Sequence, residues 1–248
     1  MSMRGLAVNS SVPVARWATS TPAAGPAAAY GSFMYLGQLW TDHRAFAISI
    51  AEARSLDPQQ NLVLCVGYDA LHRGNSFVTS ATRVRDSLIN SNVGVFVGVE
   101  ASGLAGRRSE LNVFSASGGA LSVTSGRLSY SLGLVGPCYS IDTACASTLA
   151  ALHVCVVTLN IDGAREEGVG IGTKVLSEAA NAATSIGGMT SSRGRCHTFD
   201  LRADGYCRGE GCGAFVARSG CSSLLAILGS VVLQDGPSAS LTAPNGSS

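Results

Sequence analysis

The chain has 248 residues, of which 46% are hydrophobic and 13% are charged, and its formal net charge is +1. A chain of this length and hydrophobicity can bury a substantial core in one or two domains, so it is neither a disordered tail nor a small disulfide-stapled protein. No five-residue block of like charge occurs. The sequence therefore has no electrostatic signature for binding nucleic acid or an anionic membrane.

The first 30 residues differ in composition from the rest. Ala, Ser, Pro and Gly dominate them, and the first acidic residue is Asp42. We therefore expect residues 1–30 to be a flexible leader. They contain no apolar segment typical of a secretory signal, so we expect the cysteines in a reducing compartment and the protein in the cytoplasm. Because an acid-free start with Ser and Arg is also typical of a transit peptide, a plastid or another organelle is the alternative.

A helix is predicted from Asp57 onward. Asp57 can cap it, Pro58 suits the first helical position, and Gln60 completes the spacing of a capping box. An apolar stripe follows on one face, and Gly74 can end the helix. Residues 93–99 then form a short apolar run with two glycines. This run predicts a buried strand whose backbone packs closely against another element.

Further elements are expected beyond residue 120. Helices are predicted at residues 121–132 and 146–160, and strands at residues 169–172, 213–217 and 224–233. This alternation predicts an α/β sheet with helices on its faces.

Residues 143–161 form an uncharged run that is long enough to span a bilayer. Polar residues such as His153 and Asn160 interrupt the run. We therefore interpret it as a helix buried in a protein core and expect no membrane span.

Cys145 is the candidate catalytic nucleophile. Residues 136–147 run from a turn through a short apolar strand into the predicted helix, and Cys145 lies where strand becomes helix. The free N–H groups and the positive dipole end of a helix favour a thiolate at that point. Small residues on both sides leave the sulfur approachable. This is the strand-turn-helix arrangement of a nucleophile elbow, with Cys in place of Ser.

Other cysteines give weaker signals. Cys196 and His197, with Cys207 and Cys212, could be read as a zinc cluster, but no Cys-x2-Cys pair occurs and the spacing fits no common structural site. Residues 168–174 are glycine-rich but lack the Gly-Lys-Ser/Thr of a phosphate loop. We therefore expect neither a metal site nor a nucleotide site. The cysteines predicted to be inert, from their apolar or loop neighbours, are Cys65, Cys138, Cys155 and Cys221.

The segment around Cys145 resembles the active-site signature of β-ketoacyl synthases, specifically the ketosynthase domains of modular polyketide synthases and related fatty acid synthases. The resemblance rests on Gly136-Pro137 followed by Asp142-Thr143-Ala144-Cys145-Ala146-Ser147. Further segments resemble the family in the same order, and they are residues 31–33, 46–60, 93–100, 125–130, 195–213 and 241–246. The family's first strand is not recognisable in residues 1–30.

The resemblance implies an α/β protein with the thiolase-like fold, whose layers follow the order α-β-α-β-α. This chain would supply its N-terminal half, with the nucleophile at a strand-to-helix turn. Residues 31–222 would be the ketosynthase N-terminal domain, and residues 223–248 would be the truncated start of the C-terminal half.

The resemblance also implies an acyltransferase activity with Cys145 as the catalytic residue. An acyl group would move from a carrier-protein thioester to Cys145, and a malonyl-type extender would then lose carbon dioxide and condense with it. The family's two catalytic histidines lie in its second half. His153 lies two helical turns beyond Cys145 and is expected to be a packed helix residue. The activity of the chain alone is therefore expected to be incomplete.

The resemblance implies no tightly bound cofactor. Substrates would be presented on the phosphopantetheine of an acyl carrier protein, and the complete domain would be a homodimer. One alternative is a non-catalytic half-domain or assembly subunit of a synthase complex. Another is a thiolase or a chalcone-synthase-like enzyme that uses coenzyme A thioesters, but residues 57–60 and 208–211 resemble the carrier-dependent group instead.

Overall fold

The computed structural model describes residues 9–17, 25–39, 41–74, 87–104, 112–161, 167–220, 225–234 and 236–239. Within these ranges, a four-stranded sheet has the order β4-β3-β5-β6. Its strands are β3 (Gly94–Val99), β4 (Cys138–Ile141), β5 (Glu167–Lys174) and β6 (Gly211–Arg218). β3 pairs in parallel with β4 and β5, and β6 runs antiparallel to β5. The strands predicted at residues 93–99, 169–172 and 213–217 are confirmed.

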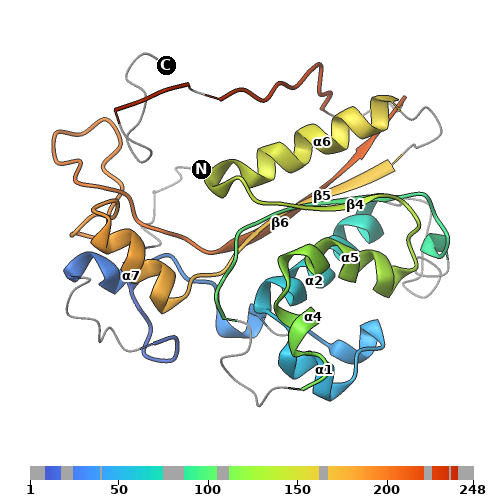
Figure 1. Ribbon diagram of the computed structural model, residues 1–248, viewed down its shortest axis with the longest axis horizontal. Coiled ribbons are helices and arrows are strands. Elements are labelled where there is room, and N and C mark those ends of the chain that lie inside the picture. Colours follow the sequence, from blue (N-terminus) through green and yellow to red (C-terminus); the bar gives the residue numbers. More distant parts are fainter. Residues whose placement is uncertain are drawn as a thin grey trace, which may run out of the picture.

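Helices cover both faces of the sheet (Figure 1). α6 (Ser147–Ile161) lies across one face, while α2 (Pro58–Gly74) and α5 (Leu121–Leu132) pack on the other. The shorter helices α1 (Ile50–Ser55) and α4 (Ser115–Gly119) lie on the same side as α2 and α5. The predicted helices are confirmed, and the three layers are the α/β arrangement that the alternation of elements predicts.

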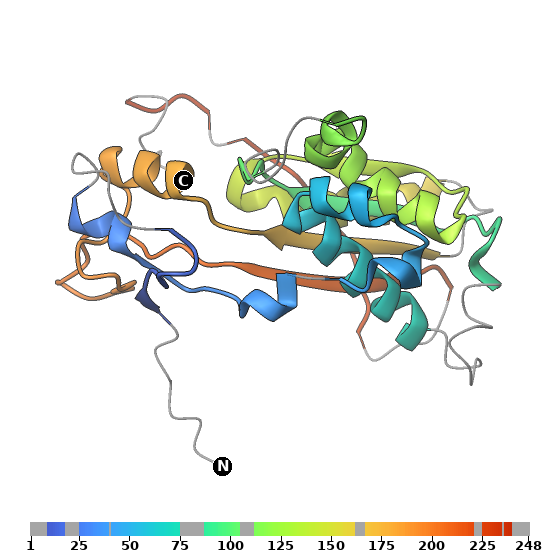
Figure 2. The same ribbon diagram turned by 90° about the horizontal axis from the view of Figure 1, so that it is seen from below.

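The remaining described elements are short. β1 (Ser10–Ser11) pairs antiparallel with β2 (Tyr30–Gly31). 3-10 helices occur at η2 (Pro26–Ala29), η3 (Leu36–Leu39) and η4 (His43–Phe46). α7 (Glu178–Ile186) follows β5 and lies beside η2 (Figure 2), where Asn181 Nδ2 donates to the Ala28 carbonyl at 2.9 Å. Sequence analysis did not predict these elements, because each is too short to show a periodic pattern.

Side chains of the strands alternate between the two faces of the sheet. Val97 of β3 points to the side of α2 and α5, where it belongs to the same buried cluster as Leu64 and Leu128. Phe96 points to the other side and packs with Cys155 of α6. The sheet therefore has a core on each face.

α6 approaches the sheet closely because glycines face it. A Cβ added at Gly98 of β3 would lie 2.5 Å from the Ser147 backbone, and one at Gly172 of β5 would overlap Thr148 Oγ1. Only residues without a Cβ leave room for the helix there. The close backbone packing predicted from the glycines of residues 93–99 is confirmed, and it sets the position of the first turn of α6.

The start of α2 differs from the predicted capping box. The Asp57 carboxylate accepts a hydrogen bond from the Gln59 N–H at 2.8 Å, so Asp57 caps the helix as predicted. Gln60 is instead buried, and its amide group donates to the Ser117 carbonyl at 3.0 Å and accepts from Arg127 Nε at 2.6 Å. The reciprocal bond of the capping box was predicted wrongly, because a buried arginine takes the Gln60 oxygen.

The strand predicted at residues 224–233 is not formed. Residues 225–234 are exposed and pair with no strand of the described structure. His153 Nδ1 of α6 lies 2.9 Å from Ser230 Oγ, so the segment runs on the α6 side of the sheet. Its apolar, β-branched residues favour an extended backbone, but a strand also needs the hydrogen-bonding edge of a neighbouring strand.

Part of the predicted leader packs against the folded core. The Arg16 guanidinium donates to the Glu210 carboxylate and, at 3.2 Å, to the Leu176 carbonyl. The side chains of Arg16 and Glu210 are 6% and 0% exposed, and the Trp17 and Phe33 rings meet edge to face with their centroids 5.5 Å apart. Residues 9–17 are therefore held in place. The domain boundaries at residues 30 and 222 stay predictions.

One helical stretch, Ala144–Ile161, is long and apolar enough to cross a membrane by length and composition. Its residues Ala151 and Cys155 face the sheet and are fully buried, while Leu149 and Ile161 are 70% and 79% exposed. The predicted core helix is therefore buried on one side only in this structure.

Replacing Gly98 with Ala should displace α6, because the new methyl group would lie 2.5 Å from the Ser147 backbone, which moves only with the helix. We expect the free energy of unfolding to fall by about 1–3 kcal/mol, measured by urea denaturation. Gly213→Ala in β6 is the matched control, since a Cβ there would meet no atom within 4 Å. Equal stability of the two variants would contradict the close packing.

Candidate active site

Cys145 lies between the sheet and α6. β4 ends at Ile141, residues 144–146 form the 3-10 helix η5 (Ala144–Ala146), and α6 begins at Ser147. Cys145 is the middle residue of η5 and is exposed. The predicted strand-turn-helix arrangement is therefore present. The candidate nucleophile lies in the 3-10 turn just ahead of the first α-helical residue.

The side chain of Ser147 holds this turn in place through hydrogen bonds to its backbone. Its side chain is buried, and its Oγ accepts from the Thr143 N–H at 2.8 Å and donates to the Ala144 carbonyl at 2.7 Å. Asp142 Oδ1 accepts from the Ala144 N–H at 3.1 Å. Both sides of the turn that carries Cys145 are thus bonded to fixed groups.

The turn holds one residue in an unfavourable conformation. Ala144 has φ 53°, in the left-handed region that costs a non-glycine residue about 1 kcal/mol. Such a conformation persists only where neighbouring contacts impose it, and here the bonds of Ser147 and Asp142 do so. Sequence analysis treated Ser147 only as a small neighbour of the nucleophile. Its role depends on backbone geometry that no sequence pattern displays.

The N-terminal end of α6 places partial positive charge next to Cys145. The aligned backbone dipoles of α6 give its first turn partial positive charge. The first two N–H groups after Cys145, those of Ala146 and Ser147, donate to the carbonyls of Thr143 and Ala144. An anion bound next to this turn would be favoured by the dipole of α6.

The other described cysteines differ in exposure. Cys155 is fully buried, and burial raises its pKa to about 11, which keeps it a neutral thiol near pH 7. Burial also raises the pKa of Cys212 to about 11. Cys138 and Cys196 are exposed, so they are the competitors of Cys145 for a reagent in solution. Cys221, which was predicted to be inert, lies outside the described residues.

Two of the described histidines, His43 and His153, have hydrogen-bond partners away from Cys145. His153 is bonded to Ser230, and His43 Nδ1 lies 2.8 Å from the Ile48 carbonyl oxygen. Neither hydrogen bond involves Cys145. Among the residues that the structure describes, no group of three or more His, Cys, Asp or Glu side chains could hold a metal ion.

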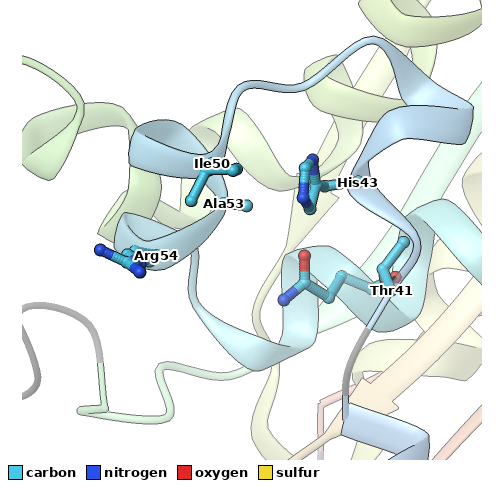
Figure 3. Close-up of a pocket in the computed structure, with 6 residues that line it drawn as sticks. Thr41, His43, Ile50, Ala53 and Arg54 are labelled. Atoms are coloured by element: carbon cyan, nitrogen blue, oxygen red, sulfur yellow. Dashed lines mark hydrogen bonds between the residues drawn. The ribbon is translucent and has the colours of Figure 1, made fainter.

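A separate cavity of about 170 Å³ lies away from Cys145, between η4, α1 and α2. Figure 3 shows His43 and Thr41 on one side of it and the residues of α1 on the other. Its lining residues are Thr41, His43, Ile50, Ala53, Arg54 and Asn61. Because α1 and α2 lie on the opposite face of the sheet from α6 (Figure 1), this cavity is not part of the Cys145 site.

The fold and the site together define an α/β protein with an exposed cysteine at a nucleophile elbow. The chain matches the family described as "Beta-ketoacyl synthase, N-terminal domain" over residues 4–219. It therefore belongs to the β-ketoacyl synthase family, through that family's N-terminal domain. The match begins at residue 4, whereas the resemblance in the sequence was recognised only from residue 31. The packed segment around Arg16 is thus part of the family's domain.

The similar proteins are components of polyketide synthases. The chain is 38% identical over 214 residues to one phenolphthiocerol/phthiocerol polyketide synthase polypeptide of Mycobacterium tuberculosis (strain CDC 1551 / Oshkosh), covering 82% of this chain and 14% of that protein. It is 38% identical over 218 residues to another polypeptide of the same synthase, from strain ATCC 25618 / H37Rv, covering 83% of this chain and 10% of that protein. The chain thus spans a small part of the length of these relatives.

Solved ketosynthase structures have the same fold. The ketosynthase from module 6 of the bacillaene synthase from Bacillus subtilis 168 matches with a TM-score of 0.69 and 26% identity, covering 84% of this chain and 34% of that chain. An oxazolomycin ketosynthase domain from Streptomyces albus JA3453 matches with a TM-score of 0.68 and 28% identity, covering 84% of this chain and 37% of that chain. The predicted thiolase-like fold class is therefore confirmed, and the chain spans about a third of these domains.

Limited treatment with iodoacetamide should label Cys145 first, because it is exposed and lies just ahead of α6, whose N-terminal end attracts negative charge. Cys138 is the internal control, since it is exposed but lies on β4 away from a helix start. Peptide mass spectrometry at short reaction times gives both rates. Faster labelling of Cys138 in the folded protein would show that the start of α6 does not activate Cys145.

Replacing Ser147 with Ala should slow the alkylation of Cys145 about two- to five-fold, the range that corresponds to losing one helix-terminus interaction with a charge. The variant removes the two bonds that hold the turn. Ser140→Ala is the control, because it removes the two hydrogen bonds of the Ser140 hydroxyl with Ser125, one from the Ser125 N–H and one to its Oγ, on the face away from α6. Circular dichroism checks that both variants are folded. An unchanged rate in the Ser147 variant would mean that Ser147 does not position the nucleophile.

Proposed function

We propose that this chain is the acyl-accepting N-terminal part of a ketosynthase that works in a polyketide synthase. The Cys145 thiolate attacks the carbonyl carbon of an acyl thioester held on the phosphopantetheine of an acyl carrier protein. A carbon–sulfur bond to Cys145 forms and the carrier thiolate leaves. The observation that carries the proposal is the exposed Cys145 in a turn that Ser147 holds at the start of α6.

The same turn suits the charge that develops in this reaction. When the Cys145 thiolate attacks a thioester, the negative charge moves from its sulfur to the carbonyl oxygen of the tetrahedral intermediate. Donors that are already oriented stabilise such an oxygen without further reorganisation. The N–H groups of Ala146 and Ser147, which follow Cys145, already donate to the carbonyls of Thr143 and Ala144, so the support here is the dipole of α6, whose positive end lies next to Cys145.

The second proposed step is condensation. A malonyl-type extender loses carbon dioxide, its carbanion attacks the acyl carbonyl carbon, and the Cys145 thiolate leaves. This step needs further hydrogen-bond donors, and losing one such donor typically costs about 100- to 1,000-fold in rate. His153 and His43 are bonded elsewhere. We therefore propose that the C-terminal half of a complete ketosynthase supplies the missing donors and that this chain alone does not condense.

Partners follow from the same proposal. The relatives are polyketide synthase components, which supports an acyl carrier protein as the donor of both substrates, with phosphopantetheine as a tether. Homodimerisation of the complete domain is part of the proposal. β4 is an edge of the described sheet and its Tyr139 is 47% exposed, so an edge for pairing is available. The proposed compartment is the cytoplasm, where thiols stay reduced.

A non-catalytic assembly subunit is the second candidate. The outer side of α6 is apolar and exposed, with Leu149 70% and Ile161 79% exposed, and such a surface can bind a partner chain. In that case the reactivity of Cys145 would be irrelevant to function. The two candidates therefore differ in whether Cys145 accepts an acyl group.

Incubation with an acyl-phosphopantetheine thioester should give one acyl adduct, located on Cys145 by intact-mass and peptide mass spectrometry. Cys145→Ala should abolish the adduct while retaining the fold, since a small side chain in an exposed turn loses little packing. Cys138→Ala is the control and should still be acylated. An adduct that survives Cys145→Ala would place the acceptor elsewhere, and no adduct on the unaltered chain would favour the assembly role.

A further inference from the structure

Two cysteines meet in the segment between α7 and β6. The Cys207 N–H donates a hydrogen bond to Cys196 Sγ at 3.1 Å, and the Cys196 thiol lies 3.8 Å from the Cys207 carbonyl oxygen. The Cys196 sulfur is thus seated against the backbone of Cys207. Among the described cysteines, no other pair shares a hydrogen bond. Cys196 is exposed and Cys207 is partly exposed, so a reagent in solution can reach the pair.

We propose that Cys196 and Cys207 form a reversible disulfide bond that closes the loop between them. A disulfide requires α-carbons about 4.4–6.8 Å apart. With standard covalent dimensions, the 3.1 Å contact holds the two α-carbons within about 7 Å of each other. Rotation of the Cys207 side chain then brings the sulfurs together. The only hydrogen bond of Cys207 Sγ in the described structure is a long one of 3.8 Å to the Arg208 carbonyl.

The backbone just ahead of Cys207 is held against residues 189–191. Thr190 and Tyr206 form an isolated parallel bridge, in which the Ser191 N–H donates to the Tyr206 carbonyl at 2.9 Å and the Tyr206 N–H donates to the Met189 carbonyl at 3.1 Å. Cys207 follows directly after this bridge. The Cys207 end of the loop is therefore fixed, and the 3.1 Å contact holds Cys196 beside it, so a covalent bond between them requires less ordering of the chain than closing a free loop would.

The proposed disulfide would restrict the motion of a segment that leads into the core. Glu210 lies three residues after Cys207, and its buried carboxylate accepts from the Arg16 guanidinium and from the Leu176 N–H. Between the two cysteines lies an exposed stretch that includes Phe199, which has φ 59°. The disulfide would tie this strained, exposed stretch to the fixed backbone just ahead of Glu210.

The oxidation balances with a low-molecular-weight disulfide such as oxidised glutathione as oxidant. The Cys196 thiolate attacks one glutathione sulfur, so a mixed disulfide forms and one glutathione leaves as a thiol. The Cys207 thiolate then attacks Cys196 Sγ, and the second glutathione leaves. The two cysteines lose two electrons and two protons, which the oxidant takes up.

The surroundings of Cys207 affect how readily its thiol attacks Cys196 Sγ in the second step of the oxidation. Burial raises the pKa of the Cys207 thiol, the nearby Cys196 raises it further, and Arg195 opposes both. The step therefore needs the smaller thiolate fraction of a partly buried group. The exposed Cys196 is the sulfur that meets the oxidant first.

The test uses the full chain in buffers of reduced and oxidised glutathione, quenched with acid and mapped without reduction. We expect a linked pair of peptides carrying Cys196 and Cys207, lighter by two hydrogen atoms than the separate peptides and restored by dithiothreitol. Cys138→Ser is the matched control and should keep the link, because Cys138 is an exposed cysteine outside this loop. Cys207→Ser should leave Cys196 as a mixed disulfide with glutathione.

A second measurement separates a native bridge from one formed in unfolded chains. The oxidised protein should melt several degrees higher than the reduced protein, because the bridge restricts the unfolded state, and Cys207→Ser should show no such difference. Linkage of Cys196 or Cys207 to Cys138 instead, or glutathione on Cys196 of the unaltered chain with no link to Cys207, would overturn the proposal. A bridge that lowers the melting temperature would overturn it as well. These outcomes do not depend on acyl transfer at Cys145.

Discussion

The contact between α6 and the glycines of β3 and β5 is the constraint on which the site depends. Gly98 and Gly172 carry no Cβ at the points where the helix backbone lies on the sheet. This brings the first turn of α6 down onto the strands and buries Ser147. From that position the Ser147 side chain bonds the backbone of Thr143 and Ala144, and Cys145 is exposed. The exposed position of the Cys145 thiol is thus a consequence of backbone packing.

Ion pairs lie at the carboxyl ends of β3 and β5, next to the start of β6. The carboxyl ends of the parallel strands meet there, and the chain leaves β4 toward Cys145 at that edge. Lys174 at the end of β5 bonds Glu100 after β3 at 2.7 Å. Next to β6, the carboxylate of Glu210 is fully buried and holds the Arg16 guanidinium. A buried carboxylate is tolerated only when its oxygens are bonded, so these pairs fix the strand ends around the site.

The sequence allowed the central elements and the position of Cys145 at a strand-to-helix turn to be predicted, because these depend on local patterns. The strands at residues 93–99 and 169–172 are short apolar runs, and the cysteine at a strand-to-helix turn has a recognisable motif. The errors concern long-range partners. Gln60 has the spacing of a capping box but bonds Arg127, and residues 225–234 have strand composition but no neighbouring strand among the described residues. Arg16 lay in a segment taken for a leader, because nothing local reveals that Glu210 is its partner.

We infer that Gly98 and Gly172, which let α6 lie close to the sheet, set the reactivity of Cys145. The alkylation rate of Cys145 tests this most directly. The alkylation rate of Cys145 should be measured in Gly172→Ala, where the new methyl group would overlap the Thr148 side chain in the first turn of α6. It should be compared with the rate in Gly211→Ala, where a Cβ would meet nothing within 4 Å. The account predicts a several-fold slower reaction in the first variant and an unchanged rate in the second, with both folded. Equal rates in the two variants would contradict it.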